Sequence, residues 1–253
     1  MTSPTAQAEA ELRHKVAVSS RILGARGVTH GSVGHVSARI PGTDHIFMKA
    51  KGPNDTANEF VTERDIIRID IEGAIIEAPN GVDMPNETAM HLAVYRQRPD
   101  VLSVIHAHPD WAVALMASDA TLMPMYRAYN PPSFSLCLED IPIFPRTVTI
   151  TNDQLGLEFV ETLGDKSACL LLGHGMTAVG RTVEQATSVS LNMYELARMN
   201  YMAYAIDRPR PVPDLHEAVP GAERVAERRA RADALRTEPS DWRWQKQIGR
   251  AHV

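Results

Sequence analysis

The apolar run at residues 101–108, VLSVIHAH, ends in two histidines that lie one residue apart, His106 and His108. A short apolar run with β-branched residues predicts a buried strand, and alternate side chains of a strand leave the same face of the sheet. Both imidazoles therefore point to one place. The rest of the chain has to fold so that other groups meet them there.

Two further segments supply such groups. Glu87 opens a segment with helical apolar spacing, and residues 170–176, LLLGHGM, carry His174 between two glycines. Three neutral imidazoles and a carboxylate suit a divalent transition metal and leave positions for a substrate. The alternative is that His106 and His108 are only core histidines, but the matching Gly-His-Gly run favours a metal site.

The composition of the 253-residue chain excludes several kinds of partner. A net charge of -5 and the lack of a basic stripe argue against nucleic acid. No apolar run approaches the roughly 20 residues that cross a membrane, and the first segment has no apolar core of the signal-peptide type. The two cysteines form no Cys-x-x-Cys pair, which favours reduced thiols. We therefore expect a cytoplasmic protein whose partner is a small molecule.

Periodicity and turn residues predict short strands between helices. The predicted strands lie at residues 36–40, 45–50, 66–73, 74–79, 101–108, 141–145 and 148–151, with two more within 169–180. The predicted helices lie at residues 8–27, 87–99, 111–117, 152–164 and 182–207, with Asn152 or Asp153 and Thr182 as N-caps. Residues 121–135, rich in proline and aromatics, read as a loop. This pattern indicates an α/β or α+β fold in three layers, with a mixed or antiparallel sheet.

The character of the chain changes at residue 208. A proline-rich stretch is followed by a charged helical pattern and by Trp242 and Trp244. We interpret residues 1–207 as one metal-dependent catalytic domain and residues 208–253 as an extension that serves as a lid or an interface arm, because large aromatic side chains seldom stay fully exposed.

The order of four motifs resembles the class II aldolase/adducin superfamily. These are Gly-x-Val-Ser-x-Arg, Glu-x-x-x-His, His-x-His-Pro and a Gly-His-Gly strand, and the resemblance covers roughly residues 10–205. It implies a three-layer α/β/α sandwich around a mainly antiparallel sheet, and a homotetramer with active sites at subunit interfaces. It also implies one divalent metal ion per subunit, Zn2+ first and Mn2+ or Fe2+ as alternatives, held by His106, His108 and His174. Glu87 then resembles the carboxylate that binds the metal or swings off it to move protons.

Departures from the sugar-phosphate members of the superfamily concern the substrate. Those members have a Gly-Asn-Val-Ser run, where this chain has His35 in place of the Asn. They also have a Ser-Ser pair, where this chain has Pro85 and Asn86. A Thr-Gly pair is likewise replaced by a run that contains Lys49 and Lys51. Lysine can also bind phosphate. His35 and Lys49 suit a planar carboxylate at least as well, while the alternative for the lysines is a solvated strand.

These departures resemble the decarboxylase branch of the superfamily. We therefore predict a metal-dependent lyase of aromatic catabolism that decarboxylates a hydroxylated aromatic or dienoic carboxylate of the dihydroxyphthalate type through a metal-stabilised enediolate. Glu87 would move protons, and His35, Tyr126 or Tyr129 would protonate the carbanion, the tyrosine coming in one arrangement from a neighbouring subunit. The expected substrate contacts are Ser37, Lys49, Gly52, Asn86 and Arg127.

Two other functions stay open on the sequence. One is a class II aldolase or epimerase that acts on a small hydroxy-aldehyde or a sugar phosphate. The other is a non-catalytic, adducin-like interaction module, which would need no metal. His91, four residues after Glu87, shares its helix face and is interpreted as a packed helix histidine.

Overall fold

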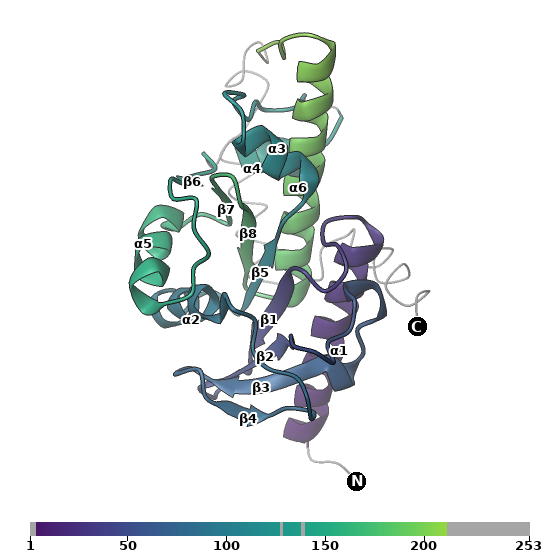
Figure 1. Cartoon of the computed structure of the whole chain (residues 1–253), viewed down its shortest axis with the longest axis vertical. Helices are drawn as coiled ribbons and strands as arrows, with labels where there is room; N and C mark the ends of the chain where they lie inside the picture. The colour runs from purple at the N-terminus through teal and green to yellow at the C-terminus, as the bar shows by residue number, and fades with distance from the viewer. Residues whose placement is uncertain (1–3, 127–128, 138–139, 212–253) are drawn as a thin grey trace.

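The computed structural model describes residues 4–126, 129–137 and 140–211, and within them the strands form one sheet. The sheet has eight strands in the order β4-β3-β2-β1-β5-β8-β7-β6 (Figure 1). Neighbouring strands are antiparallel except β6 and β7, which are parallel. Their bounds are β1 (His35–Arg39), β2 (His45–Lys49), β3 (Ile66–Asp70), β4 (Ile75–Glu77), β5 (Ser103–Ala107), β6 (Ile143–Phe144), β7 (Ala168–Leu171) and β8 (Gly175–Gly180).

Helices cover both faces of this sheet (Figure 1). The described helices are α1 (Pro4–Ala25), α2 (Thr88–Gln97), α3 (Asp110–Met116), α4 (Pro131–Cys137), α5 (Asp153–Leu163) and α6 (Val183–Ile206), with short 3-10 turns at Asn58–Phe60 and Glu63–Asp65. The helices α1 and α6 pack on one face, and α3 and α4 pack against α6. The helices α2 and α5 pack on the other face. The three-layer sandwich around a mainly antiparallel sheet is confirmed.

Alternation along the central strands divides the core into two parts. Val36 of β1 and Ile105 of β5 are register partners, and both face the core under α1 and α6. Val104 of β5 faces the core under α2 and α5 instead. Because side chains alternate between faces, the register partners His35 and His106 both face the α2 side.

Most predicted elements are confirmed, including both predicted N-caps, the first of them at Asn152. The Asn152 side chain accepts a hydrogen bond from the backbone N–H of Leu155, and the Thr182 side chain accepts one from that of Gln185. These bonds satisfy amides that have no partner in the first helical turn. The hairpin between β3 and β4 also forms, with Gly73 at a positive φ of 90°.

Two element predictions are wrong. The predicted loop at 121–135 contains the start of α4, because Asn130 Oδ1 accepts a hydrogen bond from the Ser133 N–H and Pro131 suits the first helical position. Residues 148–151 form no strand. The backbone N–H of the buried Ile150 instead lies 3.4 Å from Oε1 of Glu87, so this segment passes behind Glu87.

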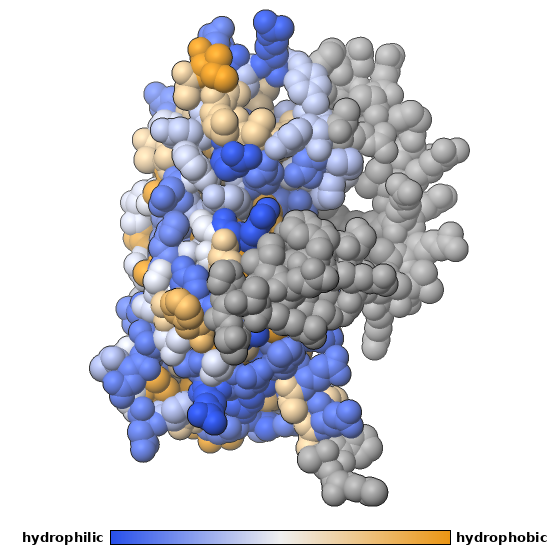
Figure 2. Space-filling view, turned by 90° about the vertical axis from the view of Figure 1, so that its right-hand side faces the viewer, coloured by the Kyte–Doolittle hydropathy of each residue, from blue (hydrophilic) through white to orange (hydrophobic). Residues whose placement is uncertain are grey.

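The surface of the described residues is mixed. Figure 2 shows a mostly hydrophilic face with hydrophobic side chains scattered over it in small groups. Among the described helices, none combines the length and the apolar character needed to cross a membrane. The cysteines are free thiols, with Cys169 buried and Cys137 half-buried. The predicted extension at 208–253 lies almost wholly outside the described residues, so its role stays a prediction.

Candidate metal centre

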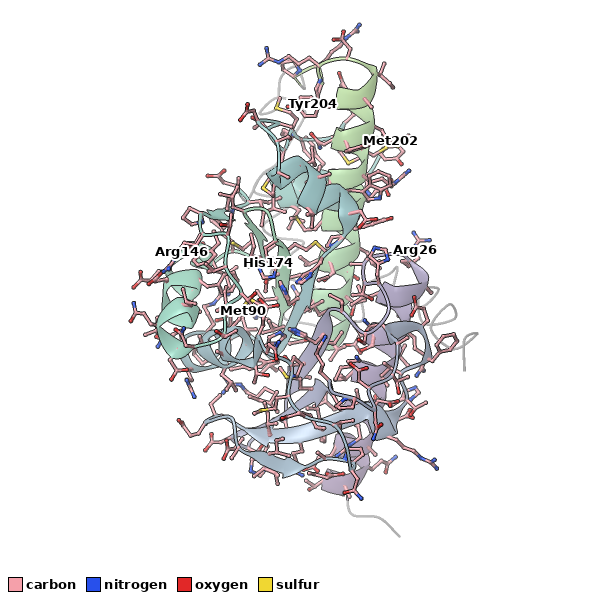
Figure 3. All side chains as sticks on the ribbon, viewed as in Figure 1. Arg26, Met90, Arg146, His174, Met202 and Tyr204 are labelled. Carbon is pink, nitrogen blue, oxygen red and sulfur yellow. The ribbon has the colours of Figure 1, made fainter. Side chains whose placement is uncertain are left out.

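Four side chains that are far apart in the sequence meet at one end of the central strands. Glu87 immediately precedes α2, His106 lies on β5, and His108 follows that strand directly. His174 lies in the turn between β7 and β8, and Figure 3 shows it in the middle of the molecule. The antiparallel pairing of β5 with β8 brings this turn beside the end of β5.

The ligand atoms of these four residues form a compact cluster. Oε2 of Glu87 lies 3.0 Å from Nε2 of His106 and 3.7 Å from Nε2 of His108, and its Oε1 lies 3.4 Å from Nε2 of His174. All four ligand atoms lie within 4.8 Å of one another. Metal–ligand bonds of about 2.0–2.2 Å place ligand atoms at such separations. This donor set therefore fits one divalent transition-metal ion, as the sequence predicted.

Burial and hydrogen bonding keep these side chains in the protonation states that bind a cation. Glu87 is 5% exposed and His106 is 0% exposed. Burial by itself raises the pKa of Glu87, but hydrogen bonds from His106, His108 and His174 outweigh it and hold the pKa well below its usual range. Burial lowers the pKa of His106, which favours the neutral imidazole that a metal needs.

The backbone geometry explains why glycine occupies both positions next to His174. Gly173 has φ +63°, a left-handed conformation that L side chains rarely adopt. A Cβ on Gly175 would lie 2.3 Å from the carbonyl oxygen of Ala107 and 3.0 Å from Cδ2 of His108. The first glycine therefore makes the turn, and the second lets β8 approach the strand that carries the other histidines.

The variant Gly175→Ala is expected to loosen metal binding more than it unfolds the protein. Its methyl group has to push the end of β5 away, which displaces His108. We expect a metal dissociation constant raised about 10- to 100-fold and a free energy of unfolding lowered by about 1–3 kcal/mol, measured by metal titration and denaturant unfolding. The control is Gly173→Ala, where the nearest atom to the new Cβ is 3.6 Å away and only backbone strain is added. Equal metal affinities in the two variants would contradict the close-approach role.

His35 lies beside the cluster, with a network of polar side chains behind it. Its ring centroid lies 5.4 Å from that of His106, and its Nδ1 lies 2.9 Å from Nε2 of His91. Ser37 is 0% exposed, and its Oγ lies 2.7 Å from both Nδ1 of His91 and the hydroxyl of Tyr95. Ser37 therefore faces these groups and has no surface for a substrate. Reasoning from the sequence missed Tyr95 and undervalued His91, whose signal was its helical spacing from Glu87.

Lys49 lies on the opposite face of the sheet from His35. Its neighbour Met48 is the register partner of Ser37, so alternation turns Lys49 toward α1. Lys49 is 1% exposed, its Nζ donates to the carbonyl oxygen of Ser32 at 3.2 Å, and burial lowers its pKa. The alternative of a solvated lysine is therefore wrong for Lys49. Its predicted contact with the substrate stays a prediction, and the structure does not bring it together with His35.

The other predicted residues lie at varied positions. Asn86 is exposed next to Glu87, and Gly52 is half-buried with φ +134°. Tyr126 and Tyr129 are 51% and 56% exposed, and the Tyr129 hydroxyl donates to Glu195 at 2.8 Å. Neither tyrosine is near the cluster by any described contact within one chain. Arg127 lies outside the described residues.

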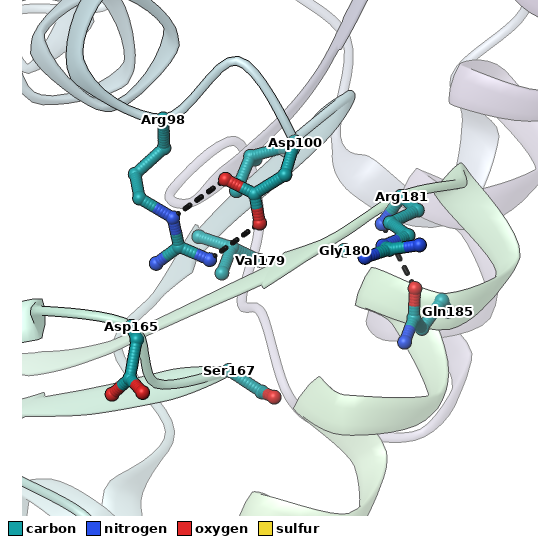
Figure 4. Close-up of a pocket in the computed structure, with 9 residues that line it drawn as sticks. Arg98, Asp100, Asp165, Ser167, Val179, Gly180, Arg181 and Gln185 are labelled. Atoms are coloured by element: carbon teal, nitrogen blue, oxygen red, sulfur yellow. Dashed lines mark hydrogen bonds and ion pairs between the residues drawn. The ribbon is translucent and has the colours of Figure 1, made fainter. Parts of the chain in front are cut away.

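A polar hollow lies at the opposite end of the central strands (Figure 4). It is lined by Arg98, Asp100, Val101, Asp165, Ser167, Val179, Gly180, Arg181 and Gln185. Arg98 there makes two hydrogen bonds to Asp100, both at 2.8 Å, and the Arg181 N–H donates to Gln185. Because Arg98 and Asp100 pair with each other and the histidines are at the other end of β5, this hollow is separate from the candidate metal centre.

Comparison with known proteins decides the family. The family model described as "Class II Aldolase and Adducin N-terminal domain" matches residues 14–201. The chain belongs to this family. The resemblance drawn from the four motifs is thereby confirmed, and the matched residues of this class II aldolase domain include all four members of the metal-binding cluster.

Two curated relatives of this class II aldolase domain are similar over most of their length. A 3,4-dihydroxyphthalate decarboxylase from Arthrobacter keyseri is 34% identical over 191 residues, which cover 74% of this chain and 77% of the relative. One from Rhodococcus jostii (strain RHA1) is 35% identical over 188 residues, 73% of this chain and 77% of the relative. The solved structure of L-fuculose 1-phosphate aldolase from Glaciozyma antarctica PI12 superposes on this chain with a TM-score of 0.74, and the match covers 100% of this chain and 92% of the aldolase chain. At 18% sequence identity, this match shows a similar fold.

Proposed function

We propose that this protein is a metal-dependent carboxy-lyase that removes carbon dioxide from a hydroxylated aromatic carboxylate of the dihydroxyphthalate type. The observation that carries the proposal is its likeness to three 3,4-dihydroxyphthalate decarboxylases, at 33–35% identity over about three quarters of both chains. The complete Glu87, His106, His108 and His174 cluster supports it, since an adducin-like interaction module would need no such donor set.

The cluster supplies the groups that this reaction requires. A divalent ion bound there acts as a Lewis acid that polarises substrate oxygens. Zn2+ suits three imidazoles and a carboxylate, and Mn2+ or Fe2+ are alternatives. The bond between the ring carbon and the carboxylate carbon breaks, carbon dioxide leaves, and the electron pair stays on the ring carbon, which then takes one proton.

Glu87 is the group we assign to that proton transfer. Its carboxylate lies among the three histidines, where it would accept the proton of a substrate hydroxyl and return it to the ring carbon. The product then leaves as a phenolate that takes a proton from water. The N-terminal end of α2 beside Glu87 favours the carboxylate form between turnovers.

His35 is the second catalytic group in this proposal. It faces the cluster from β1, and burial lowers its pKa well below the usual value, so it is neutral. Asn86 and Gly52 are assigned to the substrate, Lys49 and Arg127 stay candidates for its carboxylates, and Ser37 acts behind His35. We propose a homotetramer in which a neighbouring subunit brings Tyr126 or Tyr129, which are exposed in one chain, to the site.

Release of carbon dioxide is the experiment that tests the proposal. The purified protein is stripped of metal, reloaded in turn with Zn2+, Mn2+ and Fe2+, and incubated with a panel of catechol carboxylates that includes 3,4-dihydroxyphthalate. We expect release from at least one pair of metal and substrate, and we expect a chelator to stop it. Inorganic phosphate at millimolar levels should not inhibit, because no phosphate is recognised.

Sugar-phosphate and small hydroxy-aldehyde substrates serve as the control in the same samples. Cleavage of these compounds by protein with a verified metal content, without release of carbon dioxide from any carboxylate, would replace the carboxy-lyase with an aldolase. Failure to retain any of the three metals would instead favour the non-catalytic interaction module.

A further inference from the structure

A continuous buried network of hydrogen-bonded side chains starts at His35. Nδ1 of His35 is 2.9 Å from Nε2 of His91, Nδ1 of His91 is 2.7 Å from Oγ of Ser37, and that oxygen is 2.7 Å from the hydroxyl of Tyr95. All four side chains are buried. Two come from β1 and two from α2, so the network joins the central sheet to the helix that begins beside Glu87.

The proton of Tyr95 determines which group donates in the hydrogen bond between Tyr95 and Ser37. Burial raises the pKa of the Tyr95 hydroxyl, so the phenol keeps its proton. A buried hydroxyl that keeps its proton has to donate it, since an unpaired donor costs free energy. Among the residues that the structure describes, the acceptor within hydrogen-bond distance of the Tyr95 hydroxyl is Oγ of Ser37.

The donor in the Ser37–His91 hydrogen bond then determines the donor in the His91–His35 hydrogen bond. Ser37 has one proton of its own and two acceptors within reach, Nδ1 of His91 at 2.7 Å and the carbonyl oxygen of Val104 at 3.3 Å. An O–H···O hydrogen bond is about 2.5–3.0 Å long, so the carbonyl oxygen of Val104 is a poor acceptor for the Ser37 proton and Nδ1 of His91 is the well-placed one. With the pKa of His91 lowered to about 3, chiefly by burial, its ring is neutral and carries one proton. If Nδ1 accepts from Ser37, that proton is on Nε2 and is donated to Nδ1 of His35.

We propose that His91, together with Ser37 and Tyr95, is a positioning residue that holds His35 as the neutral tautomer with its proton on Nε2. His35 then presents a hydrogen-bond donor, aimed at an anionic substrate oxygen, beside the metal-binding cluster. The other tautomer would present a lone pair, which would compete with the three histidines for the metal and would repel that oxygen. This inference rests on the proposed function only in taking the substrate to be an anion.

The network positions a proton and does not supply one. Each proton that moved toward His35 would have to be replaced from Tyr95, and a fully buried phenol resists ionisation. His35 therefore acts as a fixed donor, and the proton that the ring carbon takes is left to Glu87.

Nitrogen NMR of the histidine rings tests the tautomer directly. The full-length protein is labelled with 15N-histidine and loaded with Zn2+, which is diamagnetic, and the ring signals are assigned from His35→Asn and His91→Asn spectra. Ring nitrogens with and without a proton have well separated 15N shifts. We expect the proton of both His35 and His91 on Nε2. A proton on Nδ1 of His35 would overturn the inference.

The variant Tyr95→Phe removes the phenol proton with little change in shape. Ser37 is then no longer forced to donate to His91, so both tautomers of His35 should become populated in the NMR spectrum. We expect kcat to fall about 10- to 100-fold, with KM and metal content changed less than about twofold. The matched control is Tyr204→Phe, because the hydroxyl of Tyr204 bonds Thr121 far from the cluster. An unchanged tautomer and kcat in Tyr95→Phe would contradict the positioning role.

The two proposals can fail separately. Release of carbon dioxide by a protein whose His35 carries its proton on Nδ1 would overturn the positioning role and leave the carboxy-lyase standing. The Nε2 proton on His35 in a protein that releases no carbon dioxide would support the positioning role and overturn the carboxy-lyase.

Discussion

Replacement of His108 by alanine is expected to weaken metal binding by more than about 100-fold, because a ligand is lost and not merely a group that supports one. Turnover should fall with metal occupancy. His108 is the best of the three histidines for this test, since its side chain is 32% exposed while that of His106 is 0% exposed. Its removal therefore leaves a smaller cavity in the core. Metal content after dialysis and isothermal titration with Zn2+ measure the effect.

The control for His108→Ala is His30→Ala. The His30 side chain is 55% exposed and lies near the start of α3, where it is 3.6 Å from Asp110. Thermal unfolding of the metal-stripped proteins should give similar midpoints for both variants and the parent. Added metal should raise the midpoint of the parent and of His30→Ala, and should raise that of His108→Ala far less. Full metal occupancy in His108→Ala would remove that histidine from the ligand set.

The candidate metal centre could be predicted because each of its four side chains carries a local signal. The strand that holds His106 is a continuous apolar run and His108 follows it directly, so the period of two predicts their common direction without knowledge of any partner. The glycines next to His174 mark a turn that is needed for close approach of strands. Only their meeting point depends on the order of the strands, and for that meeting point the prediction rested on the family resemblance.

The substrate contacts could not be predicted in the same way, because they depend on register. Ser37 and Lys49 both lie near the same end of the sheet, yet pairing of Ser37 with Met48 puts the side chains of Ser37 and Lys49 on opposite faces. A shift of one residue would reverse the faces. Burial of Ser37 against His91 and Tyr95 depends equally on the packing of α2, which no pattern in β1 encodes.

The start of α4 shows a different limit. Two prolines at 131 and 132 favoured a loop, although proline is well tolerated in the first turn of a helix. The deciding interaction is the hydrogen bond from the Ser133 N–H to Asn130, together with packing of the helix on α6. Tertiary contacts of this kind override local propensity and leave little trace in composition.

The conservative variant Glu87→Gln is expected to keep the metal and to lose turnover. An amide oxygen can still approach the ion and the backbone N–H of Ile150, so the fold and the three histidines should stay in place. The amide cannot accept a proton from a substrate hydroxyl and return it to carbon. Loss of such a general acid–base costs about 100- to 10,000-fold in kcat, measured as the initial rate of carbon dioxide release at saturating substrate.

The control for Glu87→Gln is Glu184→Gln, which changes a second buried carboxylate. Glu184 is 4% exposed on α6 and pairs with Lys15 at 2.8 Å, away from the histidines. Its change should lower stability because it leaves Lys15 without its buried partner, but it should leave kcat within about twofold of the parent. If Glu87→Gln lost metal and activity together, Glu87 would act mainly as a ligand. Retained turnover with the metal bound would exclude it as the proton carrier, and the proton would then have to reach the substrate from water or from a neighbouring subunit.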